Sequence, residues 1–320
     1  MRRLLLIALV CAVVPGTGAA KPGAVNRPLL GVSGNAARFQ AQTAQRSSVQ
    51  SVFLGWGQGQ TWGSPFAQLL ATLGPIPMVH IGTSADARLS REAVSPQGIA
   101  EGRGDAYLFA LADAVAAYDG RIYVRFLAEM NNPGTLYSPR DRRGRSRGPS
   151  HSPAQYVRAF RRAFLILHGG TAAELAARLR AVGLPGVSRD VPVNPASLLT
   201  IVWNPVAGIS LASEFYPGNA YVDMVGNDMY ASTRGVASYS ANEQLYRRYA
   251  SKPYALPEWG LQGIDDETFV QKICAFLKSR ARTKLAAYYE ARPRSRFDLA
   301  NKPKSRAVYK KCITPIGATP

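Results

Sequence analysis

Residues 121–132 read RIYVRFLAEMNN, a buried-strand pattern that contains two charged side chains. Its apolar and β-branched residues predict a strand over 121–130, which carries Arg125 and ends at Glu129. A buried charge without a partner costs roughly 3–5 kcal/mol when one member of an ion pair is missing. Both charges are therefore expected to have partners, and the position of this strand in the fold decides which.

Seven other runs have strand character, and helical stretches separate most of them. The predicted strands are 29–34, 49–56, 76–83, 121–130, 197–205, 221–230, 252–260 and 284–291. Residues 106–118, 152–167 and 265–281 have helical periodicity and terminal signals, whereas 206–220 shows no clear helix. Eight strands with crossovers predict one α/β domain, a (β/α)8 TIM barrel over residues 21–320. The alternative, a doubly wound open sheet, lacks its glycine fingerprint here.

The first twenty residues, MRRLLLIALVCAVVPGTGAA, have the three parts of a secretory signal peptide. A basic start precedes an apolar run over 4–14, and small residues follow up to Ala20. The apolar run is shorter than the ~20 residues that span a membrane. We predict a signal peptide over 1–20 and a secreted or extracytoplasmic location, in the periplasm or cell wall. No membrane span is expected after its cleavage.

The cysteine count agrees with export. Cys11 leaves with the signal peptide, and Cys274 and Cys312 remain as a pair. In an oxidising compartment a disulfide between them is expected, which would tie the C-terminal segment to a late helix. Two buried free thiols are the alternative.

The chain is strongly basic, with a formal net charge of +19. This charge favours an anionic polysaccharide or a charged wall as partner, and a solvated basic surface is the alternative. Nucleic acid is not expected, because no nucleic-acid-binding motif accompanies the charge. The histidines lack metal-ligand spacing and there is no phosphate-binding loop, so no cofactor is expected. The arginine-rich loop 138–153 either overhangs a cleft or is a solvated surface loop.

Two carboxylates are placed to share a site. In a barrel with this strand order, Glu129 lies at the end of the fourth strand and Glu258 at the end of the seventh. The functional face of such barrels is built from these strand ends. Retaining glycosidases use two carboxyl groups about 5–5.5 Å apart, one as acid and one as nucleophile.

Aromatic and polar residues at other strand ends fit a carbohydrate cleft. The candidates for substrate binding are Trp56, Arg125, Asn131, Trp203, Asp228, Tyr230 and Trp259. Each tryptophan could instead pack in the core. Arg125 could instead pair with an internal acid such as Asp223 or Asp228.

Several segments resemble glycoside hydrolase family 26, the mannanase-type barrels. The resemblance rests on GIAEGRGDAYLFALADAV followed by IYVRFLAEMNN, on YVDMVGNDMY and on KPYALPEWG. It implies that Glu129 is the acid/base and Glu258 the nucleophile. It further implies that Tyr230 hydrogen-bonds the nucleophile and that Arg125 lies beneath the pair. Two positions depart from the family pattern: Ala128 stands where the family has His, and the cleft-lining Trp of the family is either missing or replaced by Tyr137.

These observations predict a secreted, monomeric retaining glycoside hydrolase that acts on a β-linked polysaccharide, in the manner of an endo-β-mannanase. A non-catalytic glycan-binding or cell-wall-binding protein on the same barrel is the alternative. A basic structural protein of the wall, without a defined cleft, is a second alternative. Sugar and linkage stay open at this level.

Overall fold

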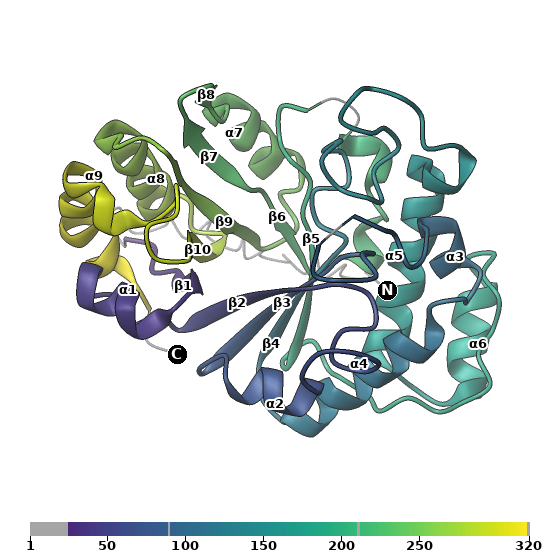
Figure 1. Cartoon of the computed structure of the whole chain (residues 1–320). Helices are drawn as coiled ribbons and strands as arrows, with labels where there is room; N and C mark the ends of the chain where they lie inside the picture. Colours follow the sequence, from purple (N-terminus) through teal and green to yellow (C-terminus); the bar gives the residue numbers. More distant parts are fainter. Residues whose placement is uncertain (1–24, 89, 210–211, 319–320) are drawn as a thin grey trace, which may run out of the picture.

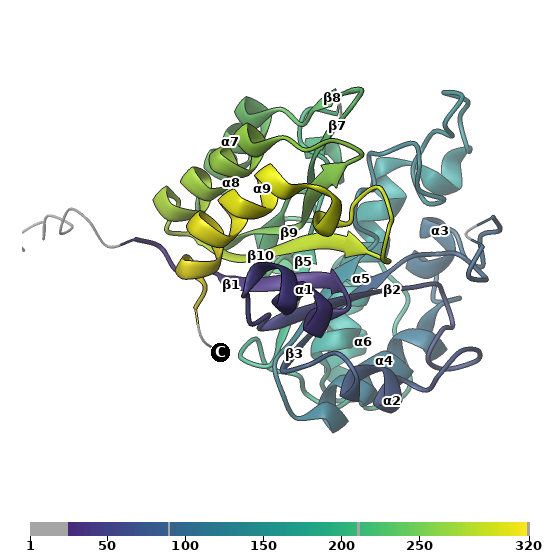
Figure 2. The ribbon, with the colours of Figure 1, turned by 60° about the vertical axis from the view of Figure 1, so that its left-hand side comes forward.

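The computed structural model describes residues 25–88, 90–209 and 212–318. The predicted signal peptide and its cleavage site lie outside the described residues. The described chain folds around one sheet, whose strands converge in the middle of the molecule with helices around them (Figures 1 and 2). No helix of this part is long and apolar enough to cross a membrane.

The sheet closes into an eight-stranded parallel barrel, which confirms the predicted fold class. Each strand pairs with the next in the order β1-β2-β3-β4-β5-β6-β9-β10, and β10 returns to β1. Closure leaves no open edge in this ring. The barrel strands are β1 Leu29–Gly34, β2 Val49–Leu54, β3 Ile76–Ile81, β4 Ile122–Phe126, β5 Leu199–Trp203, β6 Met224–Gly226, β9 Tyr254–Gln262 and β10 Thr283–Ala291.

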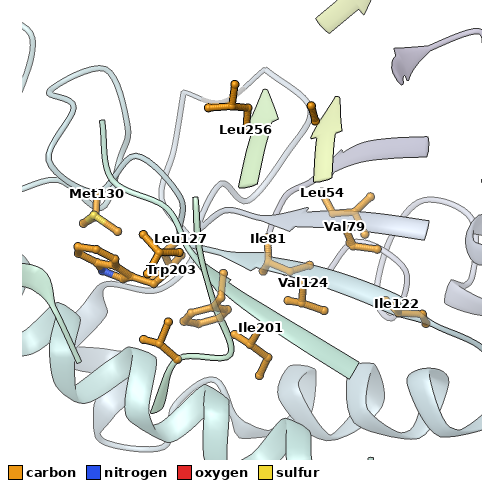
Figure 3. Close-up of a cluster of buried hydrophobic side chains, with 14 of the residues drawn as sticks. Leu54, Val79, Ile81, Ile122, Val124, Leu127, Met130, Ile201, Trp203 and Leu256 are labelled. Carbon is orange, nitrogen blue, oxygen red and sulfur yellow. The ribbon is translucent and has the colours of Figure 1, made fainter. Parts of the chain in front are cut away.

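Apolar side chains fill the barrel interior toward the N-terminal ends of the strands, and all eight strands contribute to them. A second, larger apolar layer lies between the strands and the helices, where Ile81, Val124 and Ile201 pack (Figure 3). Side chains alternate between these two layers with the period of two that a strand imposes. Tyr123 therefore faces inward and Val124 outward, and Arg125 follows inward above the apolar floor.

Helices cover the outside of the barrel, and several of them begin at side-chain caps. Ser152, Thr171, Ser238 and Asp266 each accept a hydrogen bond from the backbone three residues on, as good N-caps do. The helices are α1 Ala36–Thr43, α2 Phe66–Ala71, α3 Pro96–Ala100, α4 Asp105–Tyr118, α5 Pro153–His168, α6 Ala172–Arg180, α7 Tyr239–Arg248, α8 Glu267–Ser279 and α9 Pro303–Val308.

Most strand ends shift by one to three residues from the prediction, and two strands differ more. The run 221–230 is split into β6 and β7 (Met229–Ser232), and β7 pairs with the far half of β9 and with β8 (Gly235–Val236). The fourth strand stops at Phe126, because the chain turns at Leu127 with a φ of 47°. In the segment without a predicted helix, the described residues 206–209 and 212–220 form no α-helix, and the 3₁₀ turns Ala212–Phe215 and Asn219–Tyr221 lie there.

The predicted disulfide is present. Cys274 of α8 is bonded to Cys312, which lies in the π-helical turn Tyr309–Ile313. The bond ties the C-terminal segment to a late helix, as expected from the cysteine count.

Candidate active site

Arg125 is the centre of a buried polar network at the C-terminal end of the barrel. Its side chain is 1% exposed. Its Nη1 donates to Glu258 Oε2 at 3.0 Å, its Nη2 contacts Asp228 Oδ2, and its Nε donates to Asn204 Oδ1 at 3.2 Å. The charge that interrupted the apolar strand is thus paired with two carboxylates from neighbouring parts of the barrel.

A bulge in β9 directs Glu258 toward this network. Leu256 pairs with Ala286 of β10 and Trp259 pairs with Tyr288, so β9 advances three positions where β10 advances two. Such an extra residue bends a strand and turns the following side chains. As a result, the Leu256 and Trp259 side chains both lie in the outer layer, and the Glu258 carboxylate between them reaches Arg125. Tyr230 of β7 donates its hydroxyl proton to the other oxygen of Glu258, Oε1.

Glu129 is held by a turn directly after β4. Its φ is 58°, in the left-handed region that residues other than glycine rarely adopt, and its backbone N–H donates to the Asn204 carbonyl at 2.6 Å. Asn132 Nδ2 donates to Glu129 Oε2 at 2.8 Å. Backbone strain of this kind, about 1–3 kcal/mol, persists where the surroundings enforce it and is frequent at active sites.

The electrostatics of the network separate the two glutamates. Burial raises the pKa of Glu129, and the negative charge of Glu258 raises it further, against the opposing effects of Asn132 and Arg125. Burial also raises the pKa of Asp228. One guanidinium cannot neutralise three carboxylates in one buried site, so a proton is retained there. Burial raises the pKa of Asp228 more strongly than that of Glu129, but Asp228 binds Arg125 directly and Glu129 has no such bond among the described contacts. On this geometry we assign the retained proton to Glu129.

Both glutamates line one cavity of about 440 Å³, together with Arg125 and Asp228. The opposite wall holds residues that the sequence did not single out: Phe53, which is 40% exposed, and His80. They occupy the same level as Arg125, because Phe53 pairs with His80 and His80 pairs with Arg125 in register. Burial and the charge of Arg125 lower the pKa of His80, which keeps its ring neutral. Phe53 and His80 occupy inward-facing positions of β2 and β3, so counting alternate positions along these two strands could have identified them.

The three tryptophans do not line this cavity, and the expectation that they form its rim is corrected. Trp203 is fully buried and its indole N–H donates to the Phe215 carbonyl at 3.0 Å. Trp259 is 1% exposed and stacks on Tyr309. Trp56 packs against Tyr107. Each sits in the outer apolar layer, because strand alternation and local packing turn it away from the barrel axis.

Asn131 and the arginine-rich loop lie beside the cavity. The Asn131 side chain makes two hydrogen bonds with the backbone of Val206. Its Nδ2 donates to the Val206 carbonyl at 3.0 Å, and its Oδ1 accepts from the Val206 N–H at 2.9 Å, which joins two loops. The loop 138–153 begins with a hairpin closed between Arg140 and Ser146. A Cβ added to Gly134, a cavity-lining residue, would lie 3.7 Å from the Arg142 guanidinium. The loop is therefore an ordered part of the rim on the Glu129 side.

Replacing Arg125 with methionine is expected to lower the free energy of unfolding by about 3–5 kcal/mol, since it leaves Asp228 and Glu258 without their cation. Arg121→Met, at the exposed start of the same segment, is the control and should cost less than about 0.5 kcal/mol. Urea unfolding measures both. The double variant Arg125→Met/Asp228→Asn should recover part of the loss. A cost below about 1 kcal/mol for Arg125→Met would show that the network is not coupled as described.

Within residues 25–88, 90–209 and 212–318, no cluster of three or more His, Cys, Asp or Glu side chains could hold a metal ion. The polar groups around the cavity are instead engaged with one another: Arg125 with Asp228 and Glu258, and Tyr230 with Glu258. The chemistry available to this site from the described residues is that of carboxyl groups and a tyrosine.

Comparisons with known proteins agree with this fold. The family model described as Glycosyl hydrolase family 26 matches residues 192–293. The mannanase BCman of Bacillus subtilis is 17% identical with a TM-score of 0.58, over 90% of this chain and 86% of that one. The β-mannanase BoMan26A of Bacteroides ovatus is 15% identical with a TM-score of 0.55, over 90% and 88%. The endo-β-1,4-mannanase of Bacillus sp. JAMB-750 is 12% identical with a TM-score of 0.57, over 92% and 87%. No curated protein sequence matches the chain.

The fold is thus a (β/α)8 barrel, like that of these three mannanases. More narrowly, the chain resembles a divergent member of glycosyl hydrolase family 26, as the sequence motifs predicted. The matched segment contains β5 to β10 and therefore Asp228, Tyr230 and Glu258.

Proposed function

We propose that the protein is a retaining glycoside hydrolase that cuts within a β-linked polysaccharide, with Glu129 as acid/base and Glu258 as nucleophile. The observation that carries the proposal is the unequal treatment of the two glutamates in one cavity. Both oxygens of Glu258 receive hydrogen bonds, from Arg125 and from Tyr230, whereas Glu129 has no bond to either group among the described contacts and burial raises its pKa. A retaining glycosidase needs this difference between its two carboxyl groups.

In the first step, the Glu129 carboxyl gives its proton to the glycosidic oxygen while a Glu258 oxygen attacks the anomeric carbon. The bond to the leaving sugar breaks, and a covalent glycosyl ester on Glu258 forms. In the second step, Glu129, now ionised, takes a proton from water, whose oxygen attacks the same carbon and releases Glu258. Each step inverts the anomeric centre, so the product keeps the configuration of the substrate.

Tyr230 and Arg125 have matched roles in this cycle. Burial and the charge of Glu258 raise the pKa of Tyr230, so its hydroxyl keeps a proton to donate to Glu258 Oε1. Arg125 binds the other oxygen and is itself held charged by Asp228 and Glu258. These two donors fix the orientation of the Glu258 carboxyl group at the cavity.

The predicted signal peptide and the disulfide support an extracytoplasmic place of action. Similarity in fold to mannanases supports a β-linked polymer with hexose units as the class of substrate. The second candidate is a glycan-binding protein without catalysis, favoured by Ala128, which stands where the family has His.

The test is to incubate the wild-type protein with β-mannan, other neutral β-glycans and acidic β-glycans. Reducing ends measure cleavage, and NMR of the first product measures its anomeric configuration. We expect cleavage of at least one polymer with initial release of the β-anomer. Initial release of the α-anomer would contradict the retaining mechanism. Binding without cleavage across the panel would establish the non-catalytic alternative.

The alkaline limb of the pH profile is expected to follow Glu129. The first step needs the protonated carboxyl, so kcat/KM falls as pH rises through the pKa of Glu129. Because burial raises this pKa above the ordinary value of 4.5, activity should persist at a pH where an exposed glutamate has lost its proton. In Glu129→Gln, assayed on an aryl glycoside whose leaving group needs no proton, this limb should disappear. A limb that persists in the variant would assign the titration to another group.

A further inference from the structure

The segment that follows β10 contains three arginines that the proposed mechanism does not use. Residues 291–297 read ARPRSRF, and Arg292, Arg294 and Arg296 are all exposed. Together with Tyr289 and Phe297 they line a cavity of about 570 Å³, separate from the cavity that holds the glutamates. The cavity thus combines guanidinium groups with two aromatic rings.

Aromatic side chains connect this second cavity to the catalytic one. The Tyr289 ring lies 5.8 Å from Phe53, which lines the catalytic cavity, and 6.2 Å from Tyr230, which binds Glu258. Phe297 lies 4.7 Å from Tyr289 and 5.6 Å from Tyr230. One aromatic ring, that of Tyr230, therefore lies between the arginine-lined cavity and Glu258.

Two buried acids beneath the segment hold its backbone and do not neutralise its arginines. Asp298 accepts from the Arg294 backbone N–H at 2.6 Å and from the Arg38 side chain at 2.5 Å. Glu290 accepts from Arg38 at 2.8 Å and from the Leu299 backbone N–H at 3.0 Å. Among the described ion pairs, the carboxylates of Glu290 and Asp298 pair with Arg38 alone, and the three exposed guanidinium groups have no carboxylate partner.

We propose that this cavity binds an acidic sugar residue, so that the substrate is a β-linked glycan carrying carboxylates. The inference rests on the proposed function and specifies its substrate class. Guanidinium groups bind carboxylates in a planar, two-bonded arrangement, and Tyr289 and Phe297 offer flat apolar faces to a sugar ring. A glycan whose reacting sugar lies at Glu258 and which continues over Tyr289 places its next units among the arginines. The net charge of +19 also attracts such a chain from solution.

The test compares two ligands that differ in one group, a β-1,4-linked mannose pentamer and a β-1,4-linked mannuronic acid pentamer, whose C6 is a carboxylate. Calorimetry gives Kd in the full chain carrying Glu129→Gln, which slows turnover of the pentamers during the titration. The test variant adds Arg292→Gln, Arg294→Gln and Arg296→Gln. The control adds Arg27→Gln, Arg46→Gln and Arg121→Gln, three exposed arginines before β1, β2 and β4 at the opposite end of the barrel. Both triple variants lose the same charge.

We expect the acidic pentamer to bind at least about tenfold more weakly to the test variant and to change less than about twofold with the control. Kd for the neutral pentamer should not change in either. If the acidic pentamer binds equally more weakly to both triple variants, the effect is one of net charge and the proposal is overturned. Tighter binding of the neutral pentamer than of the acidic pentamer to the protein with all its arginines would also overturn it. If the test variant fails to fold, as judged by circular dichroism, the three single replacements are measured in its place.

The outcome is separable from that of the proposed function. If the wild-type protein cleaves neutral β-glycan and the three arginine replacements leave the Kd for the acidic pentamer unchanged, the hydrolase is retained and the acidic subsite is rejected. Arginine-dependent binding of the acidic pentamer without cleavage of any polymer would retain the subsite and reject the hydrolase.

Discussion

Glu258→Ala is expected to lower kcat on the preferred polymer by on the order of 10⁵-fold or more. The replacement removes the atom that attacks the anomeric carbon, and a missing nucleophile abolishes the two-step route and leaves only binding and orientation. The loss should appear in kcat with little change in substrate affinity. Reducing-end assays at high enzyme concentration measure the residual rate.

A control and a rescue make this result specific. Glu214→Ala replaces an exposed glutamate in the turn Ala212–Phe215 and should retain wild-type activity. Azide can enter the space left by Glu258 and attack the anomeric carbon directly, which gives a glycosyl azide of inverted configuration. A glycosyl azide of retained configuration, or a loss below about 100-fold, would remove Glu258 from the role of nucleophile.

Glu129→Ala is expected to lower kcat/KM on polymer by about 10²–10⁴-fold, the contribution of a positioned general acid. On an aryl glycoside with a strongly acidic leaving phenol, formation of the glycosyl ester should be nearly normal, because that leaving group departs without a proton. Hydrolysis of the ester still lacks its base, so the intermediate accumulates and both kcat and KM fall. Burst kinetics with the aryl glycoside measure the two steps separately.

Azide again distinguishes the roles. In Glu129→Ala it attacks the glycosyl ester from the face that water would use, so the expected glycosyl azide has retained configuration, the opposite of the Glu258→Ala product. Asn132→Ala serves as a comparison, because it removes the hydrogen bond to Glu129 Oε2 while leaving the carboxyl in place. It should shift the alkaline limb of the pH profile upward, since this bond lowers the pKa of Glu129. An equal loss on polymer and on the aryl glycoside would contradict the acid role of Glu129.

The polar partners in the site were predictable to different degrees. Asp228 was one of two acids considered for Arg125, and the structure selects it, while Asp223 instead binds His168 at 3.0 Å. The pairing of Tyr230 with Glu258 followed from the family motif and is present. Neither Phe53 nor His80 belongs to a motif, so they could have been found only by counting the inward-facing positions along β2 and β3.

The tryptophans show why residue type alone misleads at strand ends. A tryptophan near the end of a strand can face the cleft or the helices. Side chains alternate along a strand, so moving the tryptophan by one position changes the side that it faces. Trp203 follows the inward-facing Val202 and so faces outward, which strand alternation predicts. Trp259 is next to the catalytic candidate Glu258, and the two side chains point to opposite sides of β9.

The sequence by itself determined the barrel, the order of its strands and the disulfide. Apolar runs of strand length that alternate with capped helices have one favourable closed arrangement, because every strand must bury both faces. It also determined that Arg125, Glu129 and Glu258 come from strands whose ends meet. Only the tertiary structure decided where these groups point. The bulge in β9 and the left-handed turn at Leu127 and Glu129 each shift side-chain direction by a local backbone change that residue pattern does not encode. Such changes persist because packing and hydrogen bonds from distant segments, such as the Asn204 carbonyl, hold them in place.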